Sequence, residues 1–342
     1  MNLKTKRNIS TLCLLTLFIC NCKNDRLDIR VDEEAYKPTI VRLDERIWNM
    51  KEADFFKFTD SLKKADPNFF YGWASQVVLS QNPDMPQALV LDSFKHFYFH
   101  NYPMRNLMKD VHEKFKDLKQ LDKVGAAVYS RFKYYFPQGQ LPALITVVNG
   151  MRAYGGVFEK AICFSLDHFL GADHPLYKAL PDLPKYLYQK YSPEYFGKRI
   201  ADGLFEFTFG GVGQSPVFMQ QMILSGMQQY YIDAMLPNEH DSIRREYAAM
   251  QLKWLQQNEK QVWEHFASQK LFYSNDKEKT ERYFADGPFT QGLPNESAPR
   301  LGIWVGYKIV KKYMDTHEDV TLEMLLKEKD YNKIFTESGY KP

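Results

Sequence analysis

The chain has 342 residues, of which 44% are hydrophobic and 25% are charged, and this balance excludes an extensively disordered protein. Its 45 Lys and Arg residues exceed its 42 Asp and Glu residues by three. Lys4, Lys6 and Arg7 account for that excess, so a mature chain without its N-terminal segment is neutral and no nucleic-acid partner is expected.

The N-terminal segment has the features of an export signal. A basic head precedes a short apolar core over residues 12–19, which falls well short of the roughly 20 residues that a membrane-spanning helix needs. The core ends in Ile19-Cys20-Asn21-Cys22 rather than in the small residues of a simple secretory signal. This arrangement resembles a bacterial lipoprotein signal, which implies a signal peptide over 1–21 and a lipid on Cys22, with Cys20 as the fallback.

The segment after the signal is expected to connect the lipid to the protein. Residues 22–40 are polar, which predicts a tether, and residues 41–342 are expected to form a single domain. With Cys22 acylated, Cys163 is the one cysteine left in the mature chain. The fold is therefore predicted to be held by its core and not by an intramolecular disulfide.

Most of the mature chain has helical periodicity. Apolar residues recur at spacings of three and four, and Pro or Ser stands at several expected helix starts. The pattern predicts helices over residues 52–65, 67–81, 87–100, 104–136, 193–207, 215–236, 242–269 and 300–317.

Two short apolar runs break this pattern. Residues 141–150 and 161–170 are expected to form two strands of one small sheet, joined by a glycine-bearing connection. We therefore predict a helix-dominated α+β fold. The many Phe and Tyr residues are expected to fill its core, although their clumps also fit a stacking platform for sugars or bases.

Two groups of polar residues are candidate metal ligands. His96 and His100 lie four positions apart, as in a zinc-binding helix, but Phe97 stands where the general base would be. A second group gathers four such residues within eight positions at the end of a predicted strand: Asp167, His168, Asp173 and His174. Neighbouring strand residues point to opposite faces, and turns often carry Asp and His, so a structural role is the favoured interpretation of both groups.

The last predicted helix carries two glycines on one face. Gly302 and Gly306 each cost about 1 kcal/mol relative to alanine in a helix, so the close approach of another group is expected at that face. Tight helix packing is one interpretation. The other is a partner-binding groove with these glycines as its floor, lined by Trp304 and Tyr307 and with Arg300 as an anion anchor.

Three longer motifs, together with the lipoprotein signal, indicate a family. The segments AICFSLDHFLG, MILSGMQQYYIDAMLP and PRLGIWVGYKIVKKY occur in order, and with them the chain resembles the GldB family of gliding-motility lipoproteins over nearly its whole length. The resemblance implies a protein of the cell envelope that is lipid-anchored to a membrane. It also implies a role in gliding beside the type IX secretion machinery, with other proteins of that machinery as partners. It implies no known reaction and no cofactor.

A more distant likeness is to zinc-dependent peptidases, in which one helix carries His-Glu-x-x-His and the next supplies a Glu before a Gly. Here Asp202 and Glu206 stand at the two histidine positions, Gly203 replaces the catalytic Glu, and Ser225 precedes Gly226. This set lacks the groups with which zinc peptidases activate water, so the likeness implies a zincin-like scaffold with a lost metal site. Two exposed helix acids are the other interpretation of Asp202 and Glu206.

The residues and the two resemblances together leave three functions open. The first is a lipoprotein without enzymatic activity that holds a partner protein in the gliding apparatus. The second is a peptidase or cell-wall hydrolase with an unusual metal site at His168, Asp202 or Glu206. The third is a glycan-binding module that uses the aromatic clumps.

Overall fold

The computed structural model describes residues 26–79 and 84–342. The predicted signal peptide over 1–21, the fallback Cys20 and the predicted lipid site Cys22 lie outside these residues. Among the residues described, no helix combines the length and the apolar character needed to cross a membrane.

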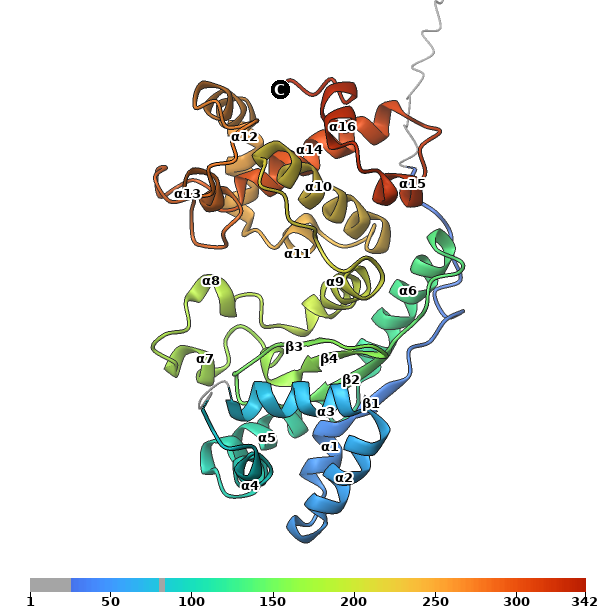
Figure 1. Ribbon diagram of the computed structural model, residues 1–342, viewed down its shortest axis with the longest axis vertical. Coiled ribbons are helices and arrows are strands. Elements are labelled where there is room, and N and C mark those ends of the chain that lie inside the picture. The colour runs from blue at the N-terminus through green and yellow to red at the C-terminus, as the bar shows by residue number, and fades with distance from the viewer. Residues whose placement is uncertain (1–25, 80–83) are drawn as a thin grey trace, which may run out of the picture.

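A small sheet lies inside a largely helical fold (Figure 1). Its strands are β1 (Ile40–Arg42), β2 (Ala143–Val147), β3 (Gly155–Val157) and β4 (Ala161–Ser165), in the spatial order β1-β2-β4-β3. β2 is parallel to β1 and to β4, and β3 is antiparallel to β4. The two predicted strands are confirmed as β2 and β4, whose almost complete burial explains their apolar sequences. β1 and β3 have three half-buried residues each, too few to show an alternating pattern.

Helices account for most of the remaining chain, which confirms the helix-dominated α+β class. Their bounds are α1 (Leu43–Trp48), α2 (Phe55–Ala65), α3 (Pro67–Ala74), α4 (Gln87–Phe99), α5 (Tyr102–Lys114), α6 (Lys119–Tyr135), α7 (Pro175–Ala179), α8 (Lys185–Tyr188), α9 (Phe196–Phe209), α10 (Phe218–Met235), α11 (Asp241–Arg245), α12 (Ala249–Ser268), α13 (Lys277–Thr280), α14 (Leu301–Thr316), α15 (Leu322–Lys327) and α16 (Tyr331–Glu337). In Figure 1, α1 to α5 lie at the lower end of the molecule on one side of the sheet, α10 to α16 form the upper end, and α9 lies between the sheet and the upper helices.

The aromatic clumps lie mainly in the core. Phe94, Phe97 and Tyr98 from α4 are buried, and the Phe94 ring packs edge-on against Trp73 with ring centroids 4.9 Å apart. The indole of Trp73 donates to the side chain of Asn149, which joins the helices to the end of β2. The prediction of an aromatic core is therefore confirmed.

The close approach of α10 and α14 explains two of the glycines. A Cβ atom on Gly306 would overlap the carbonyl group of Met222 and lie 3.0 Å from its Cα, and one on Gly226 would lie 2.8 Å from the backbone nitrogen of Tyr307. A Cβ on Gly302 would lie 2.8 Å from the ring of Phe284. The glycine face is thus filled by the protein itself, and the expectation that these glycines form the floor of an open groove is corrected.

The segment expected to be a tether is attached to the folded domain. The Arg26 guanidinium donates hydrogen bonds to the carbonyl oxygens of Met314, at 2.8 Å, His317, at 3.2 Å, and Val320. These carbonyls lie at and just beyond the C-terminal end of α14, where backbone acceptors have no helical partner. Leu27 is buried, so the predicted tether over 22–40 is corrected from residue 26 onward.

Candidate functional site

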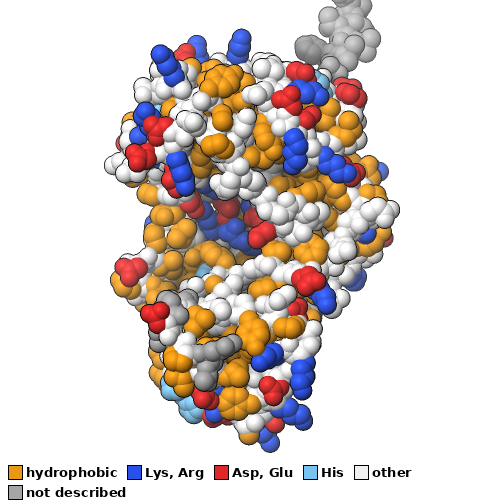
Figure 2. Space-filling model, viewed as in Figure 1, with side chains coloured by type: hydrophobic (Ala, Val, Ile, Leu, Met, Phe, Trp, Pro, Cys, Tyr) orange, Lys and Arg blue, Asp and Glu red, His pale blue; other side chains and the backbone are white. Residues whose placement is uncertain are grey.

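A cleft lies between the sheet and the C-terminal helices. Figure 2 shows it as a hollow with acidic and basic side chains gathered at its base. Its volume is about 370 Å³, and its lining comes from β3, β4, α8, α9 and the connecting segments that carry Tyr154, Phe169, Lys190, Glu246 and Asp286. A second hollow of about 530 Å³ continues from it, because Val157 and Glu206 line both.

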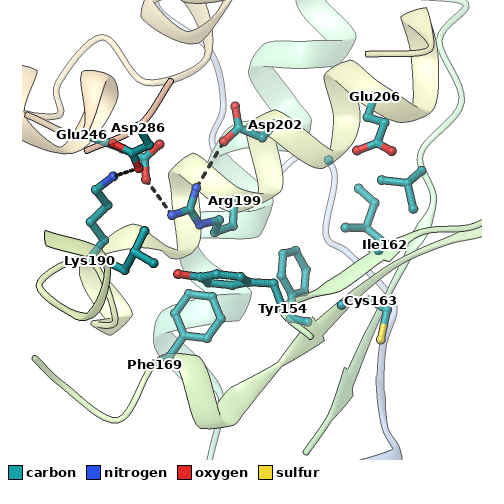
Figure 3. A pocket seen from close by; sticks show the side chains of 16 residues that line it. Tyr154, Ile162, Cys163, Phe169, Lys190, Arg199, Asp202, Glu206, Glu246 and Asp286 are labelled. Carbon is teal, nitrogen blue, oxygen red and sulfur yellow. Dashed lines mark hydrogen bonds and ion pairs between the residues drawn. The ribbon is translucent and has the colours of Figure 1, made fainter. Parts of the chain in front are cut away.

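Helix α9 positions three charged side chains over the cleft. Gly203 lets this helix approach the sheet, since a Cβ there would lie 2.7 Å from Cγ2 of Ile162. Arg199, Asp202 and Glu206 follow one another at spacings of three and four and all line the cleft (Figure 3). Gly203 therefore has a packing role at the position where the distant peptidase pattern would place a catalytic Glu.

The inner end of the cleft contains a network of ion pairs. The guanidinium of Arg199 lies 2.6 Å from the Glu246 carboxylate and 3.6 Å from that of Asp202. Lys198 is almost completely buried, donates to Asp202 and lies 3.8 Å from Glu246. A single buried charge would be costly, so this network depends on all of its members.

Glu246 occupies a strained position in the backbone. Its φ of 56° lies in the left-handed region, which residues other than glycine rarely adopt, and it separates α11 from α12. Arg300 has the same φ of 56°, and its guanidinium donates to the carbonyl oxygens of Arg245, at 2.9 Å, and Glu246, at 2.7 Å. The predicted continuous helix over 242–269 is therefore wrong at Glu246, and this break turns the Glu246 carboxylate into the cleft.

The charged groups of the cleft perturb one another. Burial would raise the pKa of Glu246, but attraction from Arg199 and Lys198 holds this pKa well below its ordinary value. Burial would lower the pKa of Arg199, but Glu246 and Asp202 raise it instead. Glu246 and Arg199 therefore remain charged at neutral pH.

A second ion pair closes the side of the cleft. Lys190, in the loop before α9, lies 2.7 Å from the carboxylate of Asp286. Burial lowers the pKa of Lys190, while Glu246 and Asp286 oppose that change. Asp286 also lies 3.6 Å from Nε of Arg300, which links the pair to the strained backbone.

The residues predicted to surround a groove are mainly packed inside the fold. Trp304 and Tyr307 are buried, and the Arg245 guanidinium lies 3.5 Å from the centroid of the Tyr307 ring. Arg300 is bonded to two carbonyl oxygens and stacks over Tyr247, so its guanidinium holds the loop between α11 and α12 rather than projecting freely as an anion anchor. Partner binding beside these residues stays a prediction.

The three candidates for a degenerate peptidase site do not meet. Asp202 and Glu206 line the cleft, whereas Ser225 lines a separate hollow between α10 and α13. Within residues 26–79 and 84–342, no three His, Cys, Asp or Glu side chains are grouped as metal ligands would be.

The segment after β4 that contains Asp167 and His168 packs against a wall of the cleft. The predicted strand over 161–170 ends at Ser165, and the next residues form a short 3₁₀ helix. Asp167 is fully buried and accepts a hydrogen bond from the backbone of Met151 at 2.6 Å. The ring of His168 stacks on Tyr154 with centroids 4.1 Å apart, and Tyr154 lines the cleft.

The remaining histidine and aspartate candidates lie at the surface or form local contacts. His100 lies 2.8 Å from Glu52, and its ring stacks on that of His96. Asp173 pairs with Lys178, and His174 caps the start of α7.

Four lining residues carry no signal in the sequence: Tyr154, Lys190, Glu246 and Asp286. Glu246 lies within a predicted helix, and Lys190 and Asp286 lie in different loops. Their proximity depends on contacts between segments distant in the chain, such as that from Lys190 to Asp286.

Comparison with known proteins identifies the family. The sequence profile of the family described as gliding motility protein GldB matches residues 24–342, which is nearly the whole chain. The comparisons with curated proteins and with solved structures found no match. The resemblance drawn from the three motifs is confirmed, and the chain belongs to the GldB family of gliding-motility lipoproteins.

Proposed function

We propose that this lipoprotein serves gliding by holding a partner protein in the cleft and that it breaks no bond in that partner. The ion-pair network is the observation that carries the proposal. Asp202 and Glu246 are held by Lys198 and Arg199, and the low pKa of Glu246 keeps this carboxylate ionised. Acids bound in this way are poor general acids and bases near neutral pH, whereas fixed charges form a preorganised binding surface.

The proposal includes a location. A lipid on Cys22 would anchor the protein to a membrane of the cell envelope, and the partner would be another component of the gliding machinery, associated with type IX secretion. Family membership supports the role in gliding and the lipoprotein character. The two hollows joined at Val157 give the partner a continuous surface.

A hydrolase is the second candidate, and Glu206 is the residue that favours it. This acid is exposed in the cleft, and the described part of the chain provides it with no ion pair. Metal analysis of the purified lipoprotein tests this candidate. Zinc at about one atom per chain that is lost in Glu206→Ala would favour the hydrolase over the binding protein.

Filling the cleft tests the proposed function directly. Val157→Trp would place an indole where the two hollows meet, and Lys109→Trp places the same side chain on the exposed surface of α5. We expect cells carrying Val157→Trp as their only copy to lose gliding, while the protein stays as abundant as Lys109→Trp. Normal gliding by Val157→Trp cells would refute the proposal.

A further inference from the structure

We infer that the cleft takes an extended, basic segment of a polypeptide, which adds to the sheet as a strand beside β3. This inference rests on the proposed function and specifies the chemistry of the partner. Three observations carry it: the outer edge of β3, the continuity of the two hollows, and the two acids that line the second hollow.

The pairing of β3 leaves its outer edge open to a further strand. Phe158 exchanges two backbone hydrogen bonds with Ala161, and Tyr154 accepts one from Ser165. Because such pairs alternate in an antiparallel ladder, Gly155 and Val157 direct their N–H and C=O groups away from β4. Gln76 donates to the Gly155 carbonyl oxygen. Within residues 26–79 and 84–342, this leaves the Gly155 N–H and both backbone groups of Val157 for a partner strand.

The shape of the site fits an extended chain better than a compact ligand. The first hollow includes Tyr154 to Val157, and the second continues past Val157 to Phe158 and Glu159, which directly follow β3. Helix α9 forms the opposite wall, since Asp202 and Glu206 line the first hollow and Thr208 lines the second. A strand rises about 3.3 Å per residue, so a segment of about six residues would follow this wall from end to end.

The charges at the junction favour a basic segment. At the inner end the acids are already paired with Lys190, Lys198, Arg199 and Arg300. Glu159 and Glu206 line the second hollow, are exposed, and have no ion pair among residues 26–79 and 84–342. A Lys or Arg side chain of a bound segment would therefore meet two unneutralised carboxylates beside Val157.

Binding of defined peptides to the full lipoprotein in detergent tests the inference. The probe is a fluorescent peptide of about six residues that alternates Thr and Val around a central Lys. The control peptide has the same sequence with Glu in place of that Lys. We expect the Lys peptide to bind at least about tenfold more tightly, and methylation of its alternate backbone nitrogens to weaken binding by about tenfold. Glu206→Lys should remove the preference for Lys. Glu264→Lys, which alters another exposed acid, on α12, should leave this preference unchanged.

Equal binding of the two peptides, full binding of the methylated peptide, or no binding up to about 1 mM would overturn the inference. The same holds if Glu206→Lys keeps the preference for Lys. The outcome can be separated from that of the proposed function. If the peptides fail to bind but Val157→Trp cells lose gliding, the inference of an extended segment is refuted and the proposal of a partner in the cleft stands. If Val157→Trp cells glide normally, both are refuted.

Discussion

Replacing Gly306 by Ala tests whether the glycine face of α14 is filled by α10. In an open groove the substitution would stabilise the helix by about 1 kcal/mol, because alanine has the higher helix propensity. In the structure the new Cβ would overlap the carbonyl group of Met222 and lie 3.0 Å from its Cα. Both atoms belong to a helix backbone, so relief requires the two helices to move apart.

The magnitude follows from these two opposing effects. Overpacking of a well-filled core costs about 1–3 kcal/mol, and a clash between two backbones belongs at or above the upper end of that range. After the gain in helix propensity, we expect Gly306→Ala to lower the free energy of unfolding by about 2 kcal/mol. Urea unfolding followed by circular dichroism measures this difference.

Gly197→Ala in α9 is the matched control. There the added Cβ would lie 3.1 Å from Cδ2 of Leu236, the end of a flexible side chain that can move aside. We expect the gain in propensity to balance or exceed this contact, so the control should unfold within about 1 kcal/mol of the wild type. If Gly306→Ala were as stable as the wild type, the two helices would not touch at Gly306 and an open groove would again be possible.

Other changes test the cleft and the anchor. Glu246→Gln should cost about 3 kcal/mol at pH 7, because it leaves Arg199 and Lys198 buried without their partner. The folded-state pKa of Glu246 is lowered, so its stabilisation is complete above about pH 4.3 and is lost as the pH falls below that value. The urea midpoints of the wild type and of Glu246→Gln should therefore converge as the pH is lowered. A difference between the midpoints that stays constant with pH would contradict the ion-pair assignment. Arg26→Ala should speed hydrogen exchange at the backbone amides of Leu27 and Ile29 by about tenfold. Arg30→Ala, which changes an exposed arginine nearby, should leave this exchange unchanged. Equal exchange in the two variants would show that Arg26 does not hold this segment. Cys22→Ser should abolish labelling by a fatty-acid analogue, and persistent labelling would assign the lipid to Cys20.

Much of the fold could be predicted from local patterns. α2, α5 and α14 have apolar residues at helical spacing, and β2 and β4 are short apolar runs, so their residue types identify them without knowledge of their neighbours. Tight helix packing and a binding groove both require a group close to Gly302 and Gly306. The structure shows that this group belongs to the same chain, since the backbone of Met222 lies at Gly306 and the ring of Phe284 lies at Gly302.

The cleft could not be predicted in the same way. Glu246 breaks a helix without a Gly or Pro to mark the break, because the contact from Arg300 to its carbonyl holds the strained backbone from a distant part of the chain. Arg26 looked like part of a polar tether, since its acceptors lie nearly at the opposite end of the sequence. Asp202 and Glu206 were identified as candidates by their spacing. Asp202 pairs with Lys198 and Arg199 inside α9, but the pairing of these two cations with Glu246 depends on tertiary contacts.

Photo-crosslinking in gliding cells tests most directly whether the cleft holds a partner. A photoreactive phenylalanine analogue at position 157 would lie at the junction of the two hollows, and the same analogue at position 109 would lie on exposed α5. We predict that position 157 forms a crosslink to one envelope protein, and that mass spectrometry locates it in a basic, extended segment of that protein. No crosslink at position 157, or the same products from both positions, would contradict the binding of a partner in this cleft.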